Sequence, residues 1–282
     1  MGVAGPPSGK AYGMDGCERM LLAIDIGNTN VTIGVFDGER LAHNWRLAAL
    51  RERTADELGI FVTRLFEQAK IDLARVSGIV VASVVPPLTR PMEEMCDRYF
   101  GQAAYFVDAT NAGMPVCYTP AGDVGADRIV NAVAAREIYG LTPSVPLIVV
   151  DFGTGTTFDI ISREGEYLGG IICPGIGISA EALFQRAARL PRVEVRRPPT
   201  VIGQNTVNAM QSGLFFGYVA MVEGLVARIR GELAGGSEAV VIATGGLAEV
   251  ISNECKAIER VEPDLTLQGL RLIWARNHPQ TP

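Results

Sequence analysis

Two stretches of the chain alternate between short apolar runs and turn residues in a way that predicts antiparallel strands. The first stretch holds the runs LLAIDIG, VTIGVF and ERLAHNWRLA, which are separated by GNTN and by Asp37-Gly38. Asp-Gly is a strong signal for a tight turn between two strands. The second stretch holds PLIVVDFG, TTFDIIS and EYLGGIIC, with a turn at residues 163–165 between the last two. We therefore expect a three-stranded meander at the start of each half of the chain.

Helices and strands are expected to alternate after the first meander. A helix should follow Thr54, with Glu57 at the capping-box position, and a second should end at Gly101. The runs SGIVVASVV and AAYFVDA predict strands, and a loop then leads into a helix that ends at Gly140. The first half is thus expected to run β-β-β-α-β-α-β, followed by this helix.

The second half shows the same alternation. Helical patterns cover residues 178–190, 205–233, 247–255 and 265–277, and strand patterns cover 239–246 and 257–261. The long pattern over 205–233 contains Gly213 and Gly217, where we expect a break. The fold class is therefore α/β with two duplicated lobes.

We expect three parts: a disordered N-terminal extension over 1–19, an N-terminal lobe over 20–143 and a C-terminal lobe over 144–282. The extension is polar and rich in Pro and Gly, with Met20 as an alternative start and no apolar centre of a signal peptide. Its segment GPPSGK is not a P-loop, because the glycine spacing is one residue short and no strand precedes it.

Composition narrows the classes of function. The 282 residues are 48% hydrophobic and 20% charged, which is typical of a soluble globular protein. A net charge of −6 argues against nucleic acid as a partner. Five scattered Cys without a C-x-x-C pair indicate reduced thiols in a cytoplasmic protein rather than a zinc site. No apolar run approaches the length of a membrane span, so we expect no membrane contact.

The two meanders share a chemical feature at their first turn. An apolar strand runs into Asp25-Ile26-Gly27 in the first, and 126 residues later another runs into Asp151-Phe152-Gly153. A Gly at such a corner lets the backbone approach a ligand, and consecutive N–H groups can point at an anion. The Asp can hold a hydrated divalent cation. Two such corners could hold a polyphosphate from both sides of a cleft, whereas one alone would more often be a plain hairpin turn.

Further motifs make the chain resemble a known family. Duplicated corners of this type are found in the superfamily of actin, sugar kinases, acetate kinase and heat-shock chaperone ATPases. The segments DIGNTNVTIGVF, GDVGADRIVNA, VVDFGTGTTFDII, YLGGIICPGIGIS, IGQNTVNAMQSG and VIATGGLA resemble type III pantothenate kinases. The resemblance runs from about Leu21 to Asn277. It implies two ribonuclease-H-like lobes, an actin-like ATPase fold, with the ATP cleft between them.

The resemblance also implies roles for individual residues. ATP contacts are expected from Asp25, Ile26, Gly27, Asn28, Thr29, Asn30, Val31, Thr32 and Thr154. Pantothenate contacts are expected from Tyr118, Gly125, Ala126, Asp127, Arg128 and Thr206, the last across a dimer interface. Asp127 is the expected catalytic base, and Asp151 the expected ligand of a monovalent cation, K⁺ or NH₄⁺. The expected cofactors are ATP, Mg²⁺ and that cation, and the expected assembly is a homodimer.

Elementary chemistry agrees with the role of Asp127. A primary alcohol that attacks the γ-phosphate needs a carboxylate within hydrogen-bond reach. Asp127 lies at the start of an expected helix, where the macrodipole should favour its ionised form. Arg128 would suit an anionic substrate or developing phosphoryl charge. From the residues alone, a plain first-turn acid and a surface arginine explain this pair equally well.

The implied activity is ATP-dependent phosphorylation of pantothenate to 4′-phosphopantothenate, the first step of coenzyme A biosynthesis. Two alternatives remain at this point. One is a non-catalytic accessory factor for transcription on the same fold, which the retained Asp25, Asp127 and Asp151 disfavour. The other is a polyphosphate or nucleotide phosphatase, which would need a base aimed at water.

Overall fold

Two five-stranded sheets form the centre of the protein in a computed structural model, which describes residues 19–140 and 144–279. The P-loop-like segment and nearly all of the expected N-terminal extension lie outside these residues. The strands are β1 (Met20–Ile26), β2 (Asn30–Asp37), β3 (Arg40–Ala48), β4 (Val76–Ser83), β5 (Tyr105–Phe106), β6 (Leu147–Phe152), β7 (Gly155–Ile161), β8 (Tyr167–Pro174), β9 (Val240–Thr244) and β10 (Arg260–Val261). The helices are α1 (Ala55–Ala69), α2 (Pro86–Phe100), α3 (Ala126–Tyr139), α4 (Ile176–Arg186), α5 (Thr206–Glu232), α6 (Ala248–Ser252) and α7 (Leu265–Asn277), with short 3₁₀ turns at Leu73–Arg75, Ala121–Asp123 and Gly236–Glu238.

The two sheets have the same topology, which confirms the duplication. The first has the strand order β3-β2-β1-β4-β5, and the second has the order β8-β7-β6-β9-β10 when read in the matching direction. In each sheet the first three strands along the chain form an antiparallel meander, and the remaining two join in parallel. Both sheets are therefore ribonuclease-H-like, and the expected α/β fold with two duplicated lobes is confirmed.

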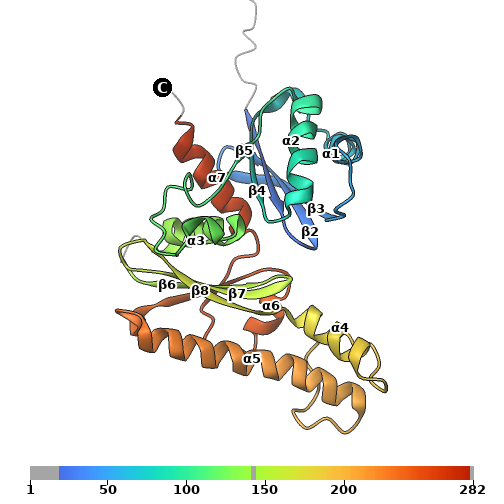
Figure 1. Cartoon of the computed structure of the whole chain (residues 1–282), viewed down its shortest axis with the longest axis vertical. Helices are drawn as coiled ribbons and strands as arrows, with labels where there is room; N and C mark the ends of the chain where they lie inside the picture. The colour runs from blue at the N-terminus through green and yellow to red at the C-terminus, as the bar shows by residue number, and fades with distance from the viewer. Residues whose placement is uncertain (1–18, 141–143, 280–282) are drawn as a thin grey trace, which may run out of the picture.

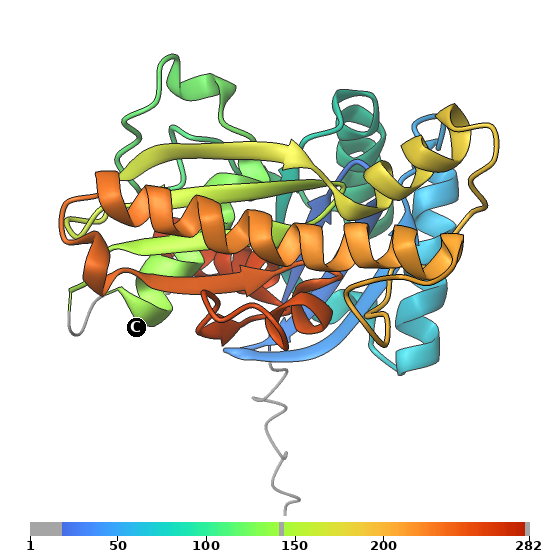
Figure 2. The same cartoon turned by 90° about the horizontal axis from the view of Figure 1, so that it is seen from below.

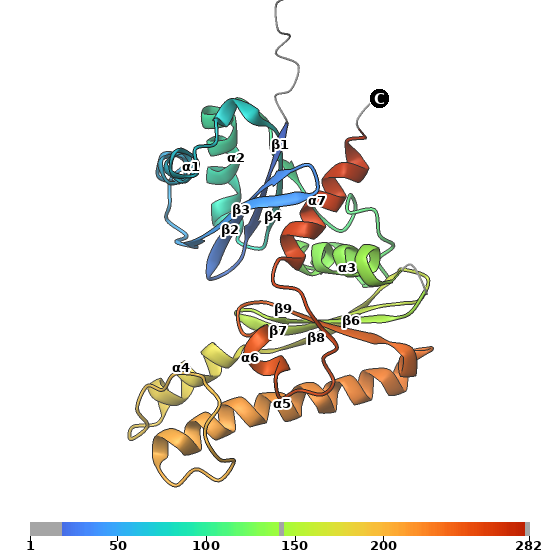
Figure 3. The same ribbon diagram turned by 180° about the vertical axis from the view of Figure 1, so that it is seen from behind.

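The helices and sheets form five layers (Figures 1 and 3). Helices α1 and α2 cover the outer face of the first sheet, and α5 covers the outer face of the second, with α4 beside its N-terminal part. Helices α3 and α7 fill the space between the sheets and share one apolar core with both. The C-terminal helix α7 packs on β1 and β4 of the first sheet, so the chain returns to its N-terminal half. The lobe limits at 143 and 144 stay a prediction.

Local signals explain several element ends. Thr54 and Glu57 form the expected capping box at the start of α1. Gly101 ends α2 in the left-handed conformation with φ 64°. The expected strand over 103–109 is reduced to the two residues of β5. Helix α5 is continuous, so the break expected at Gly213 and Gly217 is wrong. Open space surrounds both glycines, and packing of the opposite face on the sheet holds the helix.

Helix α5 also corrects our expectation about apolar length. Among the described residues, α5 is a helix that is long enough and apolar enough to cross a membrane, by length and composition alone. It lies along the second sheet (Figure 2) and packs on it through Leu214, Phe215 and Val222. Because the core helix of a globular protein passes the same test, the length and composition of α5 are only weak evidence for a membrane span.

Candidate active site

The two predicted corners face each other across one cleft. Gly27 closes the first corner by donating its backbone N–H to the Asn30 carbonyl at 2.9 Å. The second corner connects β6 to β7 and carries Thr154. The hydroxyls of Thr29 and Thr154, 125 residues apart, share a hydrogen bond of 2.7 Å, so the corners touch. The duplicated turns are thus two walls of a single site.

The cleft between the sheets has a volume of about 1090 Å³. Nine of the residues expected from the sequence line it: Asp25, Gly27, Asn28, Thr29, Asn30, Thr32, Asp127, Asp151 and Thr154. Gly153 lines it as well, in the corner where the sequence predicts that a glycine lets the backbone approach a ligand. Ile26 and Val31 do not line it, because strand alternation turns them into the apolar core below.

The remaining residues expected to bind pantothenate lie outside the lining of this cleft: Tyr118, Gly125, Ala126, Arg128 and Thr206. Tyr118 is 37% exposed, beside Gly169 of β8. Thr206 is exposed at the first turn of α5. The structure therefore brings most of the residues expected to bind ATP together, and it leaves the expected acceptor residues, apart from Asp127, outside the lining of the cleft.

Three carboxylates from different elements meet in the cleft. The pKa of Asp25 is raised to about 8, chiefly by burial and then by the charges of Asp127 and Asp151, while Arg46 acts in the opposite direction. Burial also raises the pKa of Asp151 to about 7, again with help from Asp127. Such mutual repulsion means that the site favours either protons or cations among these groups. The Oδ1 atom of Asp25 is buried without a hydrogen-bond partner, which fits a cation ligand.

Asp127 lies in the first turn of α3, as expected, but its electrostatics differ from the expectation. Burial raises its pKa, although the Arg128 backbone N–H, which donates to Oδ1 at 2.8 Å, acts in the other direction. The expectation that the helix dipole would dominate is therefore wrong. A raised pKa makes a carboxylate a stronger base, so the change suits proton abstraction from an alcohol.

Asp151 is held by residues that sequence reasoning missed. The Asn131 side-chain amide donates to Asp151 Oδ2 at 3.2 Å, and the Thr266 hydroxyl donates to Asn131 Oδ1 at 2.7 Å. Asn131 is almost fully buried in α3, and Thr266 lines the cleft from α7. The hydroxyl fixes the orientation of the amide, so the amide hydrogens face the carboxylate. No local pattern links Asn131 and Thr266, because they lie 135 positions apart.

Gly245 and Gly246 follow β9 and line the same cleft. Gly245 has φ +90°, and a Cβ there would lie 2.7 Å from the Phe152 carbonyl carbon. Only glycine fits both the conformation and the space. Gly246 has open surroundings, because a Cβ there would meet nothing closer than the Arg46 guanidinium at 4.0 Å.

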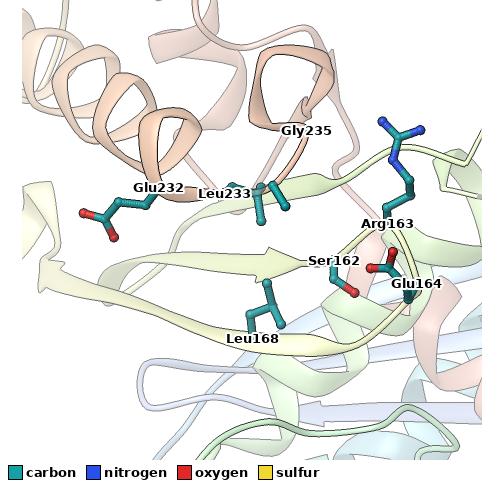
Figure 4. A pocket seen from close by; sticks show the side chains of 8 residues that line it. Ser162, Arg163, Glu164, Leu168, Glu232, Leu233 and Gly235 are labelled. Carbon is teal, nitrogen blue, oxygen red and sulfur yellow. The ribbon is translucent and has the colours of Figure 1, made fainter.

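A second hollow, of about 270 Å³, lies at the far end of β7, where the turn at residues 163–165 meets the end of α5 (Figure 4). Ser162, Arg163 and Glu232 are among its lining residues. None of the predicted site residues lines it, so the expected chemistry belongs to the larger cleft.

The fold and the cleft define a class of protein: a two-lobed protein of the actin-like ATPase fold, with a duplicated Asp-x-Gly corner on each side of the cleft. Solved structures agree on the fold. A polyphosphate/ATP-glucomannokinase from an Arthrobacter strain matches with a TM-score of 0.50 and 13% identity, over 92% of this chain and 100% of that chain. A protein from Campylobacter jejuni described as a Baf family transcriptional activator matches with a TM-score of 0.56 and 21% identity, over 91% of this chain and 98% of that chain.

Sequence comparison identifies the family. The type III pantothenate kinase family model matches residues 21–228. The type III pantothenate kinase of Myxococcus xanthus is 54% identical over 260 residues, which cover 92% of this chain and 99% of the relative. That of Moorella thermoacetica is 51% identical over 259 residues, which cover 92% and 100%. The chain belongs to the type III pantothenate kinase family.

Proposed function

We propose that this chain transfers the γ-phosphoryl group of ATP to the primary hydroxyl of pantothenate, giving 4′-phosphopantothenate in the first step of coenzyme A biosynthesis. Family membership supports the reaction. The observation that carries the proposal is the position of Asp127, which lies in the same cleft as both phosphate corners. An acceptor hydroxyl beside Asp127 would therefore face the nucleotide phosphates.

Asp127 is the proposed base. Its carboxylate accepts the proton of the acceptor hydroxyl as the oxygen attacks phosphorus. The backbone N–H groups of the first corner and the hydroxyls of Thr29 and Thr154 bind the phosphates, which requires their mutual hydrogen bond to open. Gly245 and Gly246 place the nucleoside on bare backbone. Phosphoryl transfer needs little covalent help from a protein, so positioning of this kind supplies most of the catalysis.

The residues present fit both proposed cations. No group of three or more His, Cys, Asp and Glu side chains in the described residues could hold a metal ion alone. Mg²⁺ is commonly bound by one or two carboxylates together with substrate phosphates, so Asp25, with its unpartnered buried Oδ1, fits that role. Asp151, oriented by Asn131, fits K⁺ or NH₄⁺. When bound, such cations supply charge neutralisation for the phosphates.

The acceptor side is proposed to include Tyr118, the segment Gly125 to Arg128, and Thr206 from a partner subunit in a homodimer. Exposed apolar side chains near Thr206 support an interface there: Val201, Ile202 and Val207. Ile202 is 82% exposed, which is unusual for a large apolar side chain that stays in water. Light scattering should give a dimeric mass, and a monomeric mass at micromolar concentration would contradict this part. We also propose a cytoplasmic enzyme without a nucleic-acid or membrane partner.

A coupled assay of ADP release tests the reaction. Wild-type protein with ATP, Mg²⁺ and K⁺ should turn over only when pantothenate is added. Asp127→Asn should lower kcat by about 10²- to 10⁴-fold, the range for loss of a general base. Asp123→Asn is the matched control, because this carboxylate is exposed four residues earlier and should leave kcat unchanged. ADP release without pantothenate would indicate a phosphatase, and no turnover at all would refute the proposal.

A further inference from the structure

Arg128, the residue that follows the proposed base, belongs to a buried ion pair. Arg128 Nε donates to Asp159 Oδ1 at 2.7 Å, and the two residues are 8% and 0% exposed. The Tyr167 phenol donates to the same Oδ1 at 2.8 Å, and Thr157 donates to Oδ2 at 3.3 Å. Arg128 is therefore no surface charge, and that alternative interpretation of the sequence is wrong. Burying both charges costs free energy, so the pair by itself adds little to stability, and its role is to hold neighbouring groups in place.

The pair ties the first turn of α3 to β7. Strand alternation places Thr157 and Asp159 on the same face of β7, and Thr157 lines the cleft. Helix α3 begins after Gly125 and has no side-chain hydrogen bond at its N-cap. The Arg128 side chain anchors this end of the helix to β7 instead. It also donates through Nη2 to the Phe158 carbonyl at 3.3 Å.

The neighbouring strand, β8, leaves space for the Arg128 side chain. Gly170 of β8 faces the Arg128 guanidinium, and a Cβ at this position would collide with Arg128 and with the Phe158 carbonyl. Tyr167 packs its ring 5.9 Å from the guanidinium carbon. Asp159 itself does not line the cleft, so it cannot touch the reacting atoms.

We propose that Asp159 is a positioning residue for Asp127: by fixing the Arg128 guanidinium on β7, it holds the first turn of α3 so that the Asp127 carboxylate meets the acceptor hydroxyl. The inference rests on the proposed function, because it concerns the base of that reaction. It differs from a purely structural role in one respect. Loss of Asp159 should lower kcat while nucleotide binding stays intact, since the hydrogen bonds of the pair go to Thr157, Phe158 and Tyr167 and to neither phosphate corner.

Steady-state kinetics of Asp159→Asn test the proposal. We expect kcat to fall by about 10- to 100-fold, the loss that a displacement of about 1 Å can cause, while KM for ATP stays within about twofold of wild type. Glu137→Gln is the matched control. It breaks the ion pair of Glu137 with Arg276, 2.6 Å long, at the opposite end of the same helix. This control should retain wild-type kcat, and circular dichroism checks the fold of both variants.

A double variant covers the case in which Asp159→Asn does not fold because Arg128 is left buried without a counter-charge. Arg128→Met with Asp159→Asn removes both charges while the Tyr167 phenol keeps an acceptor. The proposal again requires a lower kcat with unchanged KM for ATP. Wild-type kcat in a folded variant, or a rise confined to KM for pantothenate, overturns it. Pantothenate-dependent turnover by wild type alongside such a result would leave the proposed function standing.

Discussion

Gly245 offers a sharp test of how the second corner is supported, because a single methyl group should disturb it. Its φ of +90° is strained for any residue with a Cβ. In addition, the Cβ would lie 2.7 and 2.8 Å from the Phe152 carbonyl carbon and amide nitrogen, and close to Asp151 Oδ1. Backbone atoms in a paired strand cannot yield as the end of a side chain can. Gly245→Ala must therefore shift the turn, β6 or the Asp151 carboxylate.

The expected loss of stability in Gly245→Ala is the sum of two contributions. The left-handed backbone costs about 1–2 kcal/mol for a residue with a Cβ. Overpacking against fixed neighbours costs about 1–3 kcal/mol more. The sum, about 2–5 kcal/mol, corresponds to a lower Tm by about 4–20 °C at about 2–4 °C per kcal/mol for a chain of roughly this size. Because Asp151 lies in the path of the new methyl group, kcat should fall as well.

Thermal unfolding and the ADP-release assay together measure both effects. Gly246→Ala is the internal control, because a Cβ at this exposed position meets nothing closer than 4.0 Å. It should change Tm by only about 1–2 °C, as expected for a surface substitution that makes no close contact. Equal Tm and kcat values for Gly245→Ala and Gly246→Ala would refute the roles given to φ and to the close contacts.

Two further predictions concern the carboxylates. The folded-state pKa values of Asp25 and Asp151, about 8 and about 7, lie above the ordinary value of 3.8. The folded protein therefore binds protons that the unfolded chain releases. The stability that this proton binding contributes is lost as pH rises from about 4 through 8. The ligand-free protein should therefore show a lower Tm at pH 8 than at pH 6, Asp25→Asn should flatten this dependence, and an equal Tm at both pH values in the wild type would contradict the assignment. Asn131→Ala removes the amide that lowers the pKa of Asp151, so kcat should fall by about tenfold and recover partly at higher pH, whereas Thr63→Ala on the outer helix α1 should do neither.

Sequence patterns were sufficient for the parts of the site that are local. Each corner is encoded within a few residues, because an apolar strand, an Asp and a Gly suffice to specify a buried strand that turns sharply. Thr54 and Gly101 likewise mark helix ends through contacts that span three or four residues. The pattern failed at Gly213 and Gly217, since a glycine weakens a helix only when packing does not hold it, and α5 rests on a whole sheet.

The missed residues share a different property. Asn131 and Thr266 meet only because α3 and α7 pack together between the sheets. A signal for Asp159 did exist, because a charged residue in the middle of an apolar strand must find a partner when it is buried. Its partner, Arg128, lies 31 residues earlier on another element, and no spacing rule predicts that pairing.

The shared middle layer explains why the proposed base, Asp127, lies on a different element from the two corners. Asp25 and Asp151 each lie near the end of a strand, so each is fixed by the sheet to which it belongs. Asp127 belongs to α3, which packs on strands of both sheets and on α7. A carboxylate on this helix can approach a phosphate held between both corners without being part of either. Its position then depends on the contacts that anchor the first turn of α3, and the ion pair of Arg128 with Asp159 provides such a contact.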